Sequence, residues 1–472
     1  MLFNNVNKLI KKREQFIKNF KVQLNENKNA LPTKFHKTTK NIKTDSWFNI
    51  NYNNKYKSIP TTNIDDKIYK CKFPKKTMKS KRVIMHLTTL QKDIINNWMA
   101  VYTKMYNGTL EFLQNKFPIF KNTITRKQII EQHNHYQFTD YKNVRPNMIT
   151  YRNTLIKESQ LTHIKENTKI SAHNINYAII QLCNNIKVCY TNIIRGNMKT
   201  FRMKYLKHTR PSQTIDIELS AIRNNKICYS TLGNIKYIYN GKDYILPKIN
   251  YGVKINYNKI KNEYSLLIPE TETPKTVGHI KNKIVVLDPG LRTFMTGLSE
   301  FECLKIGDNV NNKIAKKIKK INSVKNNPNV KTRRKKQCEI KINRKIENTI
   351  DDLHWKTINI LVNNYDNILL GDMSAKSIVM RNNSVLSPNQ KVACLRTRYY
   401  VFKQRLEYKC NINKTNFKLV NECYTSKICS NCGNYNDKLK GEKFYNCLCC
   451  KIIQDRDINA CRNIYMKSRM IK

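Results

Sequence analysis

The sequence predicts an α/β fold for residues 279–472, preceded by a helical region and a small β-rich region. Two features predict the α/β fold. After residue 280, short apolar runs typical of buried strands alternate with helical repeats, and this alternation indicates a layered α/β domain. The same region carries two closely spaced cysteine pairs, which indicate a metal site within it. Because 472 residues exceed what one hydrophobic core usually serves, we expect two or three domains.

The charge of the chain indicates a polyanionic partner. There are 88 Lys and Arg against 33 Asp and Glu, a formal net charge of +55 at pH 7. Such a charge repels itself unless a polyanion neutralises it, so we expect nucleic acid as the partner and no small-molecule substrate. No apolar run approaches the roughly 18 residues of a membrane-spanning helix, and the start lacks the apolar middle of a signal peptide. We therefore expect a soluble, intracellular protein without a membrane partner.

The number of cysteines agrees with an intracellular location. Fifteen cysteines in a large chain without a signal peptide favour free thiols plus a metal site over a disulfide framework. The basic run Lys331–Lys336 fits a nuclear signal and fits phosphate contacts equally well. A nuclear or nucleoid location therefore stays open.

The N-terminal part divides into an extension and a helical region. Residues 1–80 are rich in Asn and Lys and poor in periodic apolar positions, so we predict a loosely ordered or disordered basic extension with no assigned fold. Residues 81–205 are predicted to be helical. Apolar residues recur at three- and four-residue steps between Leu90 and Met105, after Thr88 or Thr89 as the cap, and a second helix is expected over about 175–195.

A β-rich segment is predicted over residues 206–278. Short apolar runs separated by Asn and Gly turns predict its strands, which are expected at 212–217, 226–231, 244–247 and 263–268. Pro, Thr and Gly punctuate residues 269–278 as in a linker. We place the main domain boundary there.

The C-terminal α/β region has four predicted strands and three predicted helical stretches. The strands are 284–287, 293–298, 367–370 and 417–420. The first two are close enough to pair antiparallel across the turn at Asp288. Two basic helices follow, broken at Pro328, and a third helix with apolar positions from Val392 to Leu406 precedes the last strand. The basic residues proposed to bind phosphate on these helices are Lys316, Lys317, Lys319, Lys320, Arg333, Arg334, Lys335, Lys336, Arg396 and Arg398.

The most specific motif is a pair of Cys-x-x-Cys hooks within residues 424–454. Two such hooks present four thiolates at the corners of a tetrahedron, the arrangement that structural Zn²⁺ requires. The ligands are Cys429, Cys432, Cys447 and Cys450. Cys449 adjoins the second hook but does not reproduce its spacing, so we expect it to be a spectator. Because all four positions are cysteine, the single zinc is expected to fold this segment and not to catalyse.

Carboxylates mark a separate catalytic centre. Asp288 ends a buried strand, and Asp457 lies just past the zinc hooks near the start of a helix. Acids converging from separate elements can hold two Mg²⁺ ions for phosphodiester hydrolysis. Each also has an ordinary explanation: Asp288 as a turn residue, Asp455 as a helix cap and Asp457 as a partner of the helix dipole. Their occurrence together beside the four-cysteine site favours catalysis.

These motifs resemble those of the TnpB proteins, transposon-encoded relatives of the type V CRISPR nucleases. The run Ile284-Val-Val-Leu-Asp-Pro-Gly resembles their first RuvC motif. The run from Tyr424 through both hooks to Asp455-Arg-Asp-Ile-Asn-Ala resembles their zinc-containing insert and third RuvC motif. Leu87-Thr-Thr-Leu-Gln with Trp98 and the segments near residues 201, 212 and 232 are weaker likenesses, so the resemblance runs from about residue 83 onward.

The resemblance implies an RNase H-like (RuvC) catalytic domain with an inserted four-cysteine zinc ribbon, plus an N-terminal helical recognition domain and a small β wedge domain. It implies a guide RNA that directs cleavage of target DNA. In this interpretation Asp288 and Asp457 are catalytic acids that hold two Mg²⁺ ions, and the four cysteines hold one structural zinc.

The chain departs from the family at the second acid. Most members have glutamate where this chain has Gly371, and glycine has no side chain to bind metal. Asp372 and Glu422 are the two substitutes. We favour Glu422, because a one-residue slip along a strand turns Asp372 to the opposite face unless a bulge corrects it. In the Fanzor branch, found in eukaryotes and large viruses, the second acid is similarly displaced to just before the zinc insert.

Two alternative functions stay open. The missing strand-end glutamate at residue 371 also fits a guide-dependent nucleic-acid binder that no longer cuts. The cysteine hooks and the charge alone would also fit a guide-independent zinc protein that binds DNA as a transposition accessory. Measured nicking separates the first alternative from the nuclease, and copurified RNA separates the second.

Overall fold

The chain forms two compact units, Met1–Thr77 with Glu272–Lys472 and Met78–Thr271. In the described part of the chain, no helix combines the length and apolar character needed to cross a membrane. The computed structural model describes residues 40–43, 49–53, 74, 77–116, 118–128, 172–194, 198–259, 261–273, 283–300, 302–380, 386–439 and 441–470.

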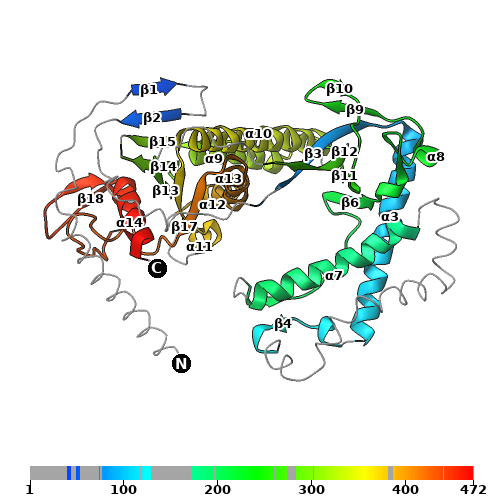
Figure 1. The fold of residues 1–472 in the computed structure, drawn as a ribbon, viewed down its shortest axis with the longest axis horizontal. Coiled ribbons are helices and arrows are strands. Elements are labelled where there is room, and N and C mark those ends of the chain that lie inside the picture. The colour runs from blue at the N-terminus through cyan, green and yellow to red at the C-terminus, as the bar shows by residue number, and fades with distance from the viewer. Residues whose placement is uncertain are drawn as a thin grey trace. The chain divides into compact units, whose positions relative to one another are not determined.

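The first unit is built on a seven-stranded sheet with strand order β1-β2-β15-β14-β13-β16-β17 (Figure 1). β13 pairs antiparallel with β14 and parallel with β16, and β16 pairs parallel with β17. The carboxyl ends of these three parallel strands therefore lie at one edge of the sheet. The strands are β1 (Lys40–Lys43), β2 (Asn49–Asn53), β13 (Ile284–Pro289), β14 (Thr293–Ser299), β15 (Cys303–Asp308), β16 (Asn367–Gly371) and β17 (Asn416–Val420).

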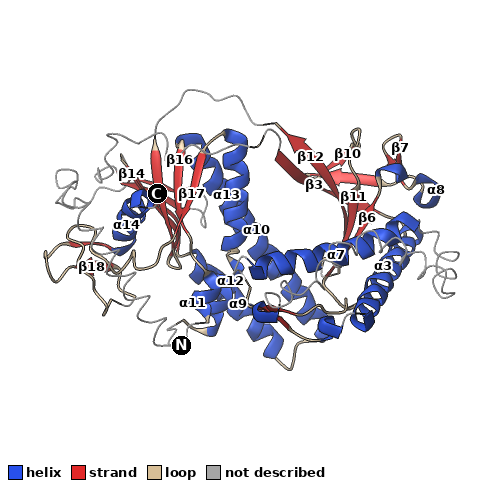
Figure 2. Cartoon of the chain, turned by 60° about the horizontal axis from the view of Figure 1, so that its bottom comes forward, coloured by secondary structure: helices blue, strands red, loops and turns tan. Residues whose placement is uncertain are grey.

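Helices cover both faces of this sheet (Figure 2). On one face, Val285 and Leu287 pack into a core with the apolar stripes of four helices. On the other face, Ile284 and Val286 pack against α14. A strand buried on both faces must be apolar at every position, which explains the continuous apolar run in the sequence. The helices are α9 (Val310–Asn326), α10 (Thr332–Asn364), α11 (Ala375–Val379), α12 (Pro388–Arg396), α13 (Tyr399–Asn413) and α14 (Arg456–Met470).

The extension predicted for residues 1–80 departs from expectation at three places, one of which is the start of β3 at Thr77. Residues 40–43 and 49–53 form β1 and β2, and β2 pairs antiparallel with β15. The expectation of no fold there is corrected: β2 reads Asn-Ile-Asn-Tyr-Asn, a two-residue alternation that the Asn and Lys content of the segment obscures. Pairing with an existing sheet edge supplies backbone hydrogen bonds that so short a strand could not form alone.

The helix predicted through Val392 and Leu406 is two helices. α12 ends at Arg396 and α13 begins at Tyr399, because Arg398 adopts a left-handed backbone conformation with φ of 48°. Val392 is 41% exposed, so the apolar stripe that suggested one continuous helix is interrupted. The break predicted at Pro328 is confirmed, since α9 ends before it and α10 begins after it.

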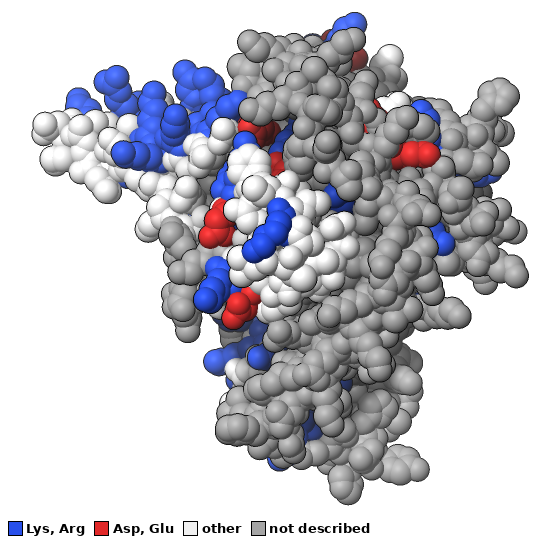
Figure 3. Space-filling model, turned by 90° about the vertical axis from the view of Figure 1, so that its left-hand side faces the viewer, with Lys and Arg blue, Asp and Glu red and all other residues white. Residues whose placement is uncertain are grey.

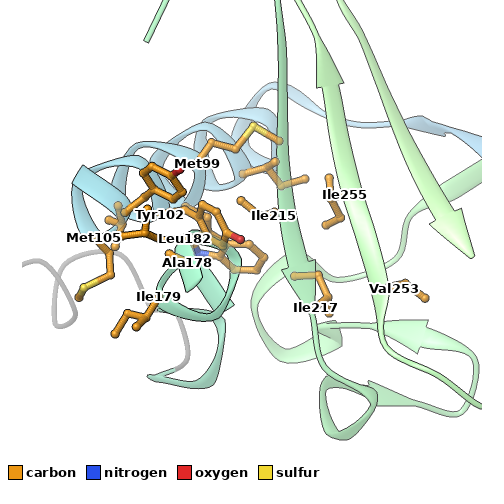
Figure 4. Packing of buried hydrophobic residues seen from close by; sticks show 14 of the residues in the cluster. Met99, Tyr102, Met105, Ala178, Ile179, Leu182, Ile215, Ile217, Val253 and Ile255 are labelled. Carbon is orange, nitrogen blue, oxygen red and sulfur yellow. The ribbon is translucent and has the colours of Figure 1, made fainter. Parts of the chain in front are cut away.

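The second unit, Met78–Thr271, joins a six-stranded antiparallel sheet to two long helices. Figure 4 shows Met99 and Tyr102 of α3 packing toward Ile215 of β6, while Met105 lies nearer Ile179 of α7. The elements are β3 (Thr77–His86), α3 (Thr89–Lys116), η2 (Pro118–Lys121), β4 (Ile124–Thr125), α7 (Ala172–Ile194), β5 (Thr200–Phe201), β6 (Ser212–Ile217), η4 (Leu219–Ala221), β7 (Ile222–Arg223), β8 (Lys226–Ile227), α8 (Tyr229–Leu232), β9 (Lys236–Tyr239), β10 (Lys242–Tyr244), β11 (Val253–Asn258) and β12 (Glu263–Glu272).

Of the local predictions for this unit, the helix cap is confirmed and two of the strands are wrong. The cap at Thr88 is confirmed, because its hydroxyl accepts the Gln91 N–H and the Gln91 side chain accepts the Thr88 N–H. The strand predicted at 226–231 is wrong: β8 is short and α8 follows it, after a left-handed turn at Cys228. The strand predicted at 244–247 is also wrong, since β10 lies earlier and ends at Tyr244.

The boundaries between the parts also differ from the expected layout. The sequence predicts separate regions at 81–205 and 206–278, whereas their buried side chains form one continuous core. The second unit ends at Thr271, within the predicted linker at 269–278, because β12 continues to Glu272.

Candidate active site and four-cysteine site

Two of the predicted acids follow strands on the face of the sheet that α14 covers. Side chains alternate along a strand, so Asp288 continues the set of Ile284 and Val286, which packs against α14. Glu422 follows Val420 by two residues, and Val420 belongs to the same core. Asp288 and Glu422 therefore lie on the same side of the sheet.

Glu422 fills the space beside Gly371. A Cβ atom added to Gly371 would lie 3.2 Å from Glu422 Oε2 and 3.1 Å from Ile464 Cδ1 of α14. The backbone register sets Gly371 opposite Val420 on β17 and one residue past Leu370, the partner of Leu287. The carboxylate of Glu422 thus lies where a side chain at position 371 would begin.

Asp372 points elsewhere. Its side chain is 47% exposed and pairs with Lys403 of α13 at 2.8 Å. The helix α13 packs on the face opposite to α14. A one-residue step along the strand has therefore turned this carboxylate to the other side of the sheet, as the sequence argument predicts.

The third acid, Asp457, lies in the first turn of α14, where the helix dipole favours negative charge. Its neighbour Asp455 has a structural role. Asp455 Oδ1 accepts the N–H groups of Asp457 and Ile458 at 3.0 and 3.4 Å, and Oδ2 pairs with Lys305 at 2.5 Å. Asp455 therefore caps the helix, which leaves Asp457 as the acid that is available for chemistry.

The charges of Asp457 and Glu422 both act on Asp288. Burial raises the pKa of Asp288 well above its ordinary value, and the negative charges of Asp457 and Glu422 raise it further. Burial followed by the charge of Asp455 raises the pKa of Asp457. All three side chains nevertheless keep some exposure to solvent. A half-buried cluster of carboxylates is stabilised by cations, and oxygen ligands of this kind suit Mg²⁺.

The cysteine hooks come together in three dimensions. The four sulfur atoms of Cys429, Cys432, Cys447 and Cys450 lie within 4.8 Å of one another. The Cys429–Cys450 and Cys432–Cys447 sulfur distances are 3.7 and 3.5 Å. A tetrahedral ion with metal–sulfur bonds of about 2.3 Å requires sulfur separations of about 3.8 Å. The predicted cysteines therefore fit one tetrahedral metal ion.

Hydrogen bonds from neighbouring N–H groups reach the cysteine hooks, while burial raises the pKa of the Cys429 and Cys432 thiols. The N–H of Cys450 points at Cys447 Sγ at 3.5 Å, and Gly433 makes the tight turn after the first hook with φ of 73°. Burial opposes ionisation of Cys450, but hydrogen bonds from Asn431 and Ile452 lower its pKa to about 7. Cys449 is exposed and outside the cluster.

The predicted phosphate-binding residues differ in exposure. The exposed residues are Lys316, Lys319, Lys320, Arg333, Arg334 and Lys336, and the half-buried residues are Lys317, Lys335, Arg396 and Arg398. Arg398 pairs with Asp351 at 2.7 Å, so its charge is neutralised within the fold. Figure 3 shows that Lys and Arg gather in one area of the face that it draws.

Some residues of the site are missed by the sequence analysis. The buried hydroxyl of Tyr399 donates to the Gly371 carbonyl at 3.0 Å, although the pattern suggested only an apolar helix position. Lys305, the partner of Asp455, lies on a strand with no local signal. Asn459 and Asn463 are fully buried on α14, and two asparagines four residues apart on an apolar helix face are the signal that could have identified them.

Known proteins resemble this chain over most of its length. Residues 399–464 match the family described as Cas12f1-like, TNB domain. TnpB-like proteins L770 and R854 of Acanthamoeba polyphaga mimivirus are each 30% identical over 420 residues, covering 86% of this chain and 76% and 75% of theirs. The solved Cas12f1–sgRNA–target DNA complex matches with a TM-score of 0.30 and 13% identity, covering 82% of this chain and 98% of that chain. A TM-score of 0.30 is too low to define a fold. The 30% identity to the TnpB-like proteins, over more than two thirds of each chain, is sufficient to assign a family.

Proposed function

Because the chain belongs to the TnpB-like protein family, we propose that it is a metal-dependent DNA endonuclease directed by a guide RNA. The observation that carries the proposal is the convergence of Asp288, Glu422 and Asp457 on one face of the sheet. Three carboxylates at the ends of strands and a helix, two of which add to the negative charge around Asp288, would serve as a ligand set for divalent cations.

The catalytic domain is proposed to be RNase H-like, of the RuvC type. Its support is the mixed sheet in which β13, β14 and β15 are antiparallel and β16 and β17 run parallel to β13. Asp288 lies at the carboxyl end of β13 and Glu422 follows β17, at the sheet edge where ligands bind in open α/β sheets.

In the proposed mechanism Asp288, Glu422 and Asp457 hold two Mg²⁺ ions. When held there, Mg²⁺ would supply Lewis-acid chemistry that activates a water molecule and neutralises charge on a leaving oxygen. The protein contributes by fixing the acids. Asp288 is anchored in the sheet, and Asp457 is anchored in the helix capped by Asp455. Arg456 lowers the pKa of Asp288 and so helps to keep this acid ionised.

Glu422 is proposed as the second acid in place of the family's strand-end glutamate. Its carboxylate adjoins the position where a residue-371 side chain would begin, and its charge raises the pKa of Asp288. Asp372 forms an ion pair with Lys403 on the opposite face of the sheet. Glu422, which follows the neighbouring strand β17, would therefore supply the carboxylate that Gly371 at the end of β16 cannot.

The four-cysteine site is proposed to hold one structural Zn²⁺. Four thiolates leave no open coordination position, so the ion would stabilise residues 424–454 and not react. Sulfur separations of 3.5 and 3.7 Å support this ligand set.

The basic helices α9 and α10 are proposed to bind phosphate of the nucleic acids. A groove on α10 is lined by Gln337, Ile340, Lys341, Arg344, Lys345 and Asn348. Burial lowers the pKa of Lys317, and the like charges of Lys345 and Lys313 lower it further. Cations that crowd one another in this way gain from a phosphate, which supplies affinity without sequence choice.

The test is to purify the chain from cells that carry its native flanking DNA, sequence any bound RNA and measure Mg²⁺-dependent cleavage of matching DNA. We expect a specific RNA, and cleavage that Asp288→Ala and Glu422→Ala abolish while Asp372→Ala retains it. Cleavage by Asp288→Ala at the parent rate would refute the proposal.

A second candidate, favoured by the glycine at position 371, is a guide-dependent binder without cleavage. Specific RNA and DNA binding with no nicking under any divalent cation would favour it. If no RNA copurifies, a guide-independent zinc protein that binds DNA accounts for the charge and the cysteine hooks.

A further inference from the structure

One polar stripe of α14 binds the chain segment that joins Glu422 to the first cysteine hook. Asn459, Asn463 and Lys467 are spaced four residues apart and so lie on one face of the helix. Their side chains hydrogen-bond to the segment 421–430. The same helix carries Asp457 in its first turn.

At the hook end, the carbonyl of Ile428 is the point of attachment. It accepts Asn459 Nδ2 at 2.8 Å and Asn463 Nδ2 at 2.7 Å. Asn459 Oδ1 in turn accepts the Ser430 N–H at 2.8 Å. Because these bonds flank Cys429, α14 fixes the backbone on both sides of the first thiol.

At the other end of the segment, the hydrogen bonds reach the backbone of Glu422 through Thr425. Asn463 Nδ2 donates to the Thr425 carbonyl at 2.6 Å, and the Thr425 hydroxyl donates to the Glu422 carbonyl at 2.8 Å. Lys467 Nζ donates to the Cys423 carbonyl at 3.2 Å. The Glu422 backbone is therefore held through Thr425 and through its own neighbour.

Glu422 depends on these bonds more than Asp288 does. Asp288 belongs to β13 and is paired with Thr296 of β14. Glu422 lies two residues beyond the end of β17, where no strand pairing fixes it. Asn459 and Asn463 are 0% exposed, and a buried amide is costly unless hydrogen-bonded. The side-chain N–H₂ groups of both amides find their partners in this segment, whereas Asn463 Oδ1 has no hydrogen-bond partner among the described residues.

We propose that Asn463 is a positioning residue for Glu422, and that Asn459 couples the first cysteine hook to the same helix. In this arrangement α14 carries one acid itself and holds the second through the segment 421–430. The inference rests on the proposed function, in which Glu422 is a metal ligand. Loss of a residue that orients a metal ligand typically weakens metal affinity by about 10- to 100-fold.

The test is titration of the zinc-loaded full chain with Mn²⁺, followed by electron paramagnetic resonance of the free ion. We expect Asn463→Ala to weaken Mn²⁺ binding by about 10- to 100-fold. In a Glu422→Gln background we expect Asn463→Ala to cause little further loss, because its effect passes through Glu422. Ser468→Ala is the matched control, since this buried hydroxyl of α14 bonds the Tyr465 carbonyl of its own helix.

Thr425→Val supplies a second variant that keeps the side-chain shape if Asn463→Ala does not fold. It removes only the hydroxyl donor to the Glu422 carbonyl, and we expect a smaller loss in the same direction. Unchanged affinity in Asn463→Ala and Thr425→Val, with a loss in Glu422→Gln, would overturn the positioning role alone. Equal losses from Asn463→Ala in both backgrounds would overturn it too, by indicating a general structural effect. Unchanged affinity in Glu422→Gln would overturn the metal role of Glu422 and this inference together.

Discussion

Restoring a carboxylate at residue 371 creates a direct conflict with Glu422. A Cβ atom at Gly371 would lie 3.1 Å from Ile464 Cδ1 and 3.2 Å from both Glu422 Oε2 and Pro289 Cδ. Ordinary contacts of this kind lie near 3.5 to 4.0 Å, so each neighbour must retreat by a few tenths of an ångström. We predict that Gly371→Glu folds poorly while Glu422 is present and is better accommodated once Glu422 is removed, although the contacts with Ile464 and Pro289 remain.

The size of the conflict has a steric part and a charge part. Overfilling a packed site costs about 1–3 kcal/mol, and Gly371→Gln carries this part alone. Two carboxylates on the order of 4 Å apart repel by about 1 kcal/mol in water and about 4 kcal/mol at an effective dielectric constant of ~20. Without divalent cations, Gly371→Glu should therefore be less stable than Gly371→Gln by about 1–4 kcal/mol. In a Glu422→Ala background that difference should shrink.

Urea unfolding measures the stability difference, and Mg²⁺-dependent cleavage of guide-matched DNA measures function. We expect Glu422→Ala to abolish cleavage and Gly371→Glu with Glu422→Ala to restore part of it. Equal stability of Gly371→Glu and Gly371→Gln, together with no restored cleavage in the double variant, would refute the inference that Glu422 and a side chain at residue 371 compete for the same space.

Four further outcomes follow from the site. Asp288→Asn should abolish cleavage but raise the free energy of unfolding at pH 7 without divalent cations. The raised pKa of Asp288 makes stability fall as pH rises above the ordinary value of 3.8; urea unfolding at pH 4 should show a smaller gain. Cys432→Ser should lower bound zinc below one per chain and reduce near-ultraviolet circular dichroism, because four ligands close the site. Asp372→Asn should retain cleavage and lose at most about 1 kcal/mol, since its pair with Lys403 is half exposed; a total loss of cleavage would make Asp372 the second acid. Lys319→Gln, at an exposed position, should weaken DNA binding at all sequences and reduce the salt dependence by about one phosphate contact; an unchanged salt slope would count against phosphate binding there.

Local motifs account for what the sequence predicts well. The hooks at 429–432 and 447–450 place two thiols each within one turn of chain, so their spacing nearly specifies the tetrahedron. The strand that ends at Asp288 is an uninterrupted apolar run, which its burial on both faces requires. The preference for Glu422 over Asp372 rests on the resemblance to the Fanzor branch and on the two-residue alternation of strands, and Asp372 and Glu422 lie on opposite faces of the sheet.

Interactions between distant segments account for what the sequence misses. β2 forms because the edge of β15 is available, and no local pattern reveals a neighbour that lies far along the chain. The break at Arg398 places this residue beside Asp351 of α10, again a partner remote in sequence. Asn459 and Asn463 look unfavourable in a helix until the carbonyl of Ile428 is seen to bind both.

Contacts between segments far apart in the sequence also decide whether the glycine at position 371 argues against catalysis. A catalytic centre requires a carboxylate at a point in space, and neighbouring parallel strands can supply it from either end. β16 and β17 are paired from Asn367 to Gly371, so a side chain two residues past β17 reaches the place that a longer residue on β16 would fill. The carboxylate of Glu422, 3.2 Å from that place, supports a displaced acid over a lost one. Loss of an aligned acid therefore favours an inactive binder only where no neighbouring strand returns a carboxylate to the same point.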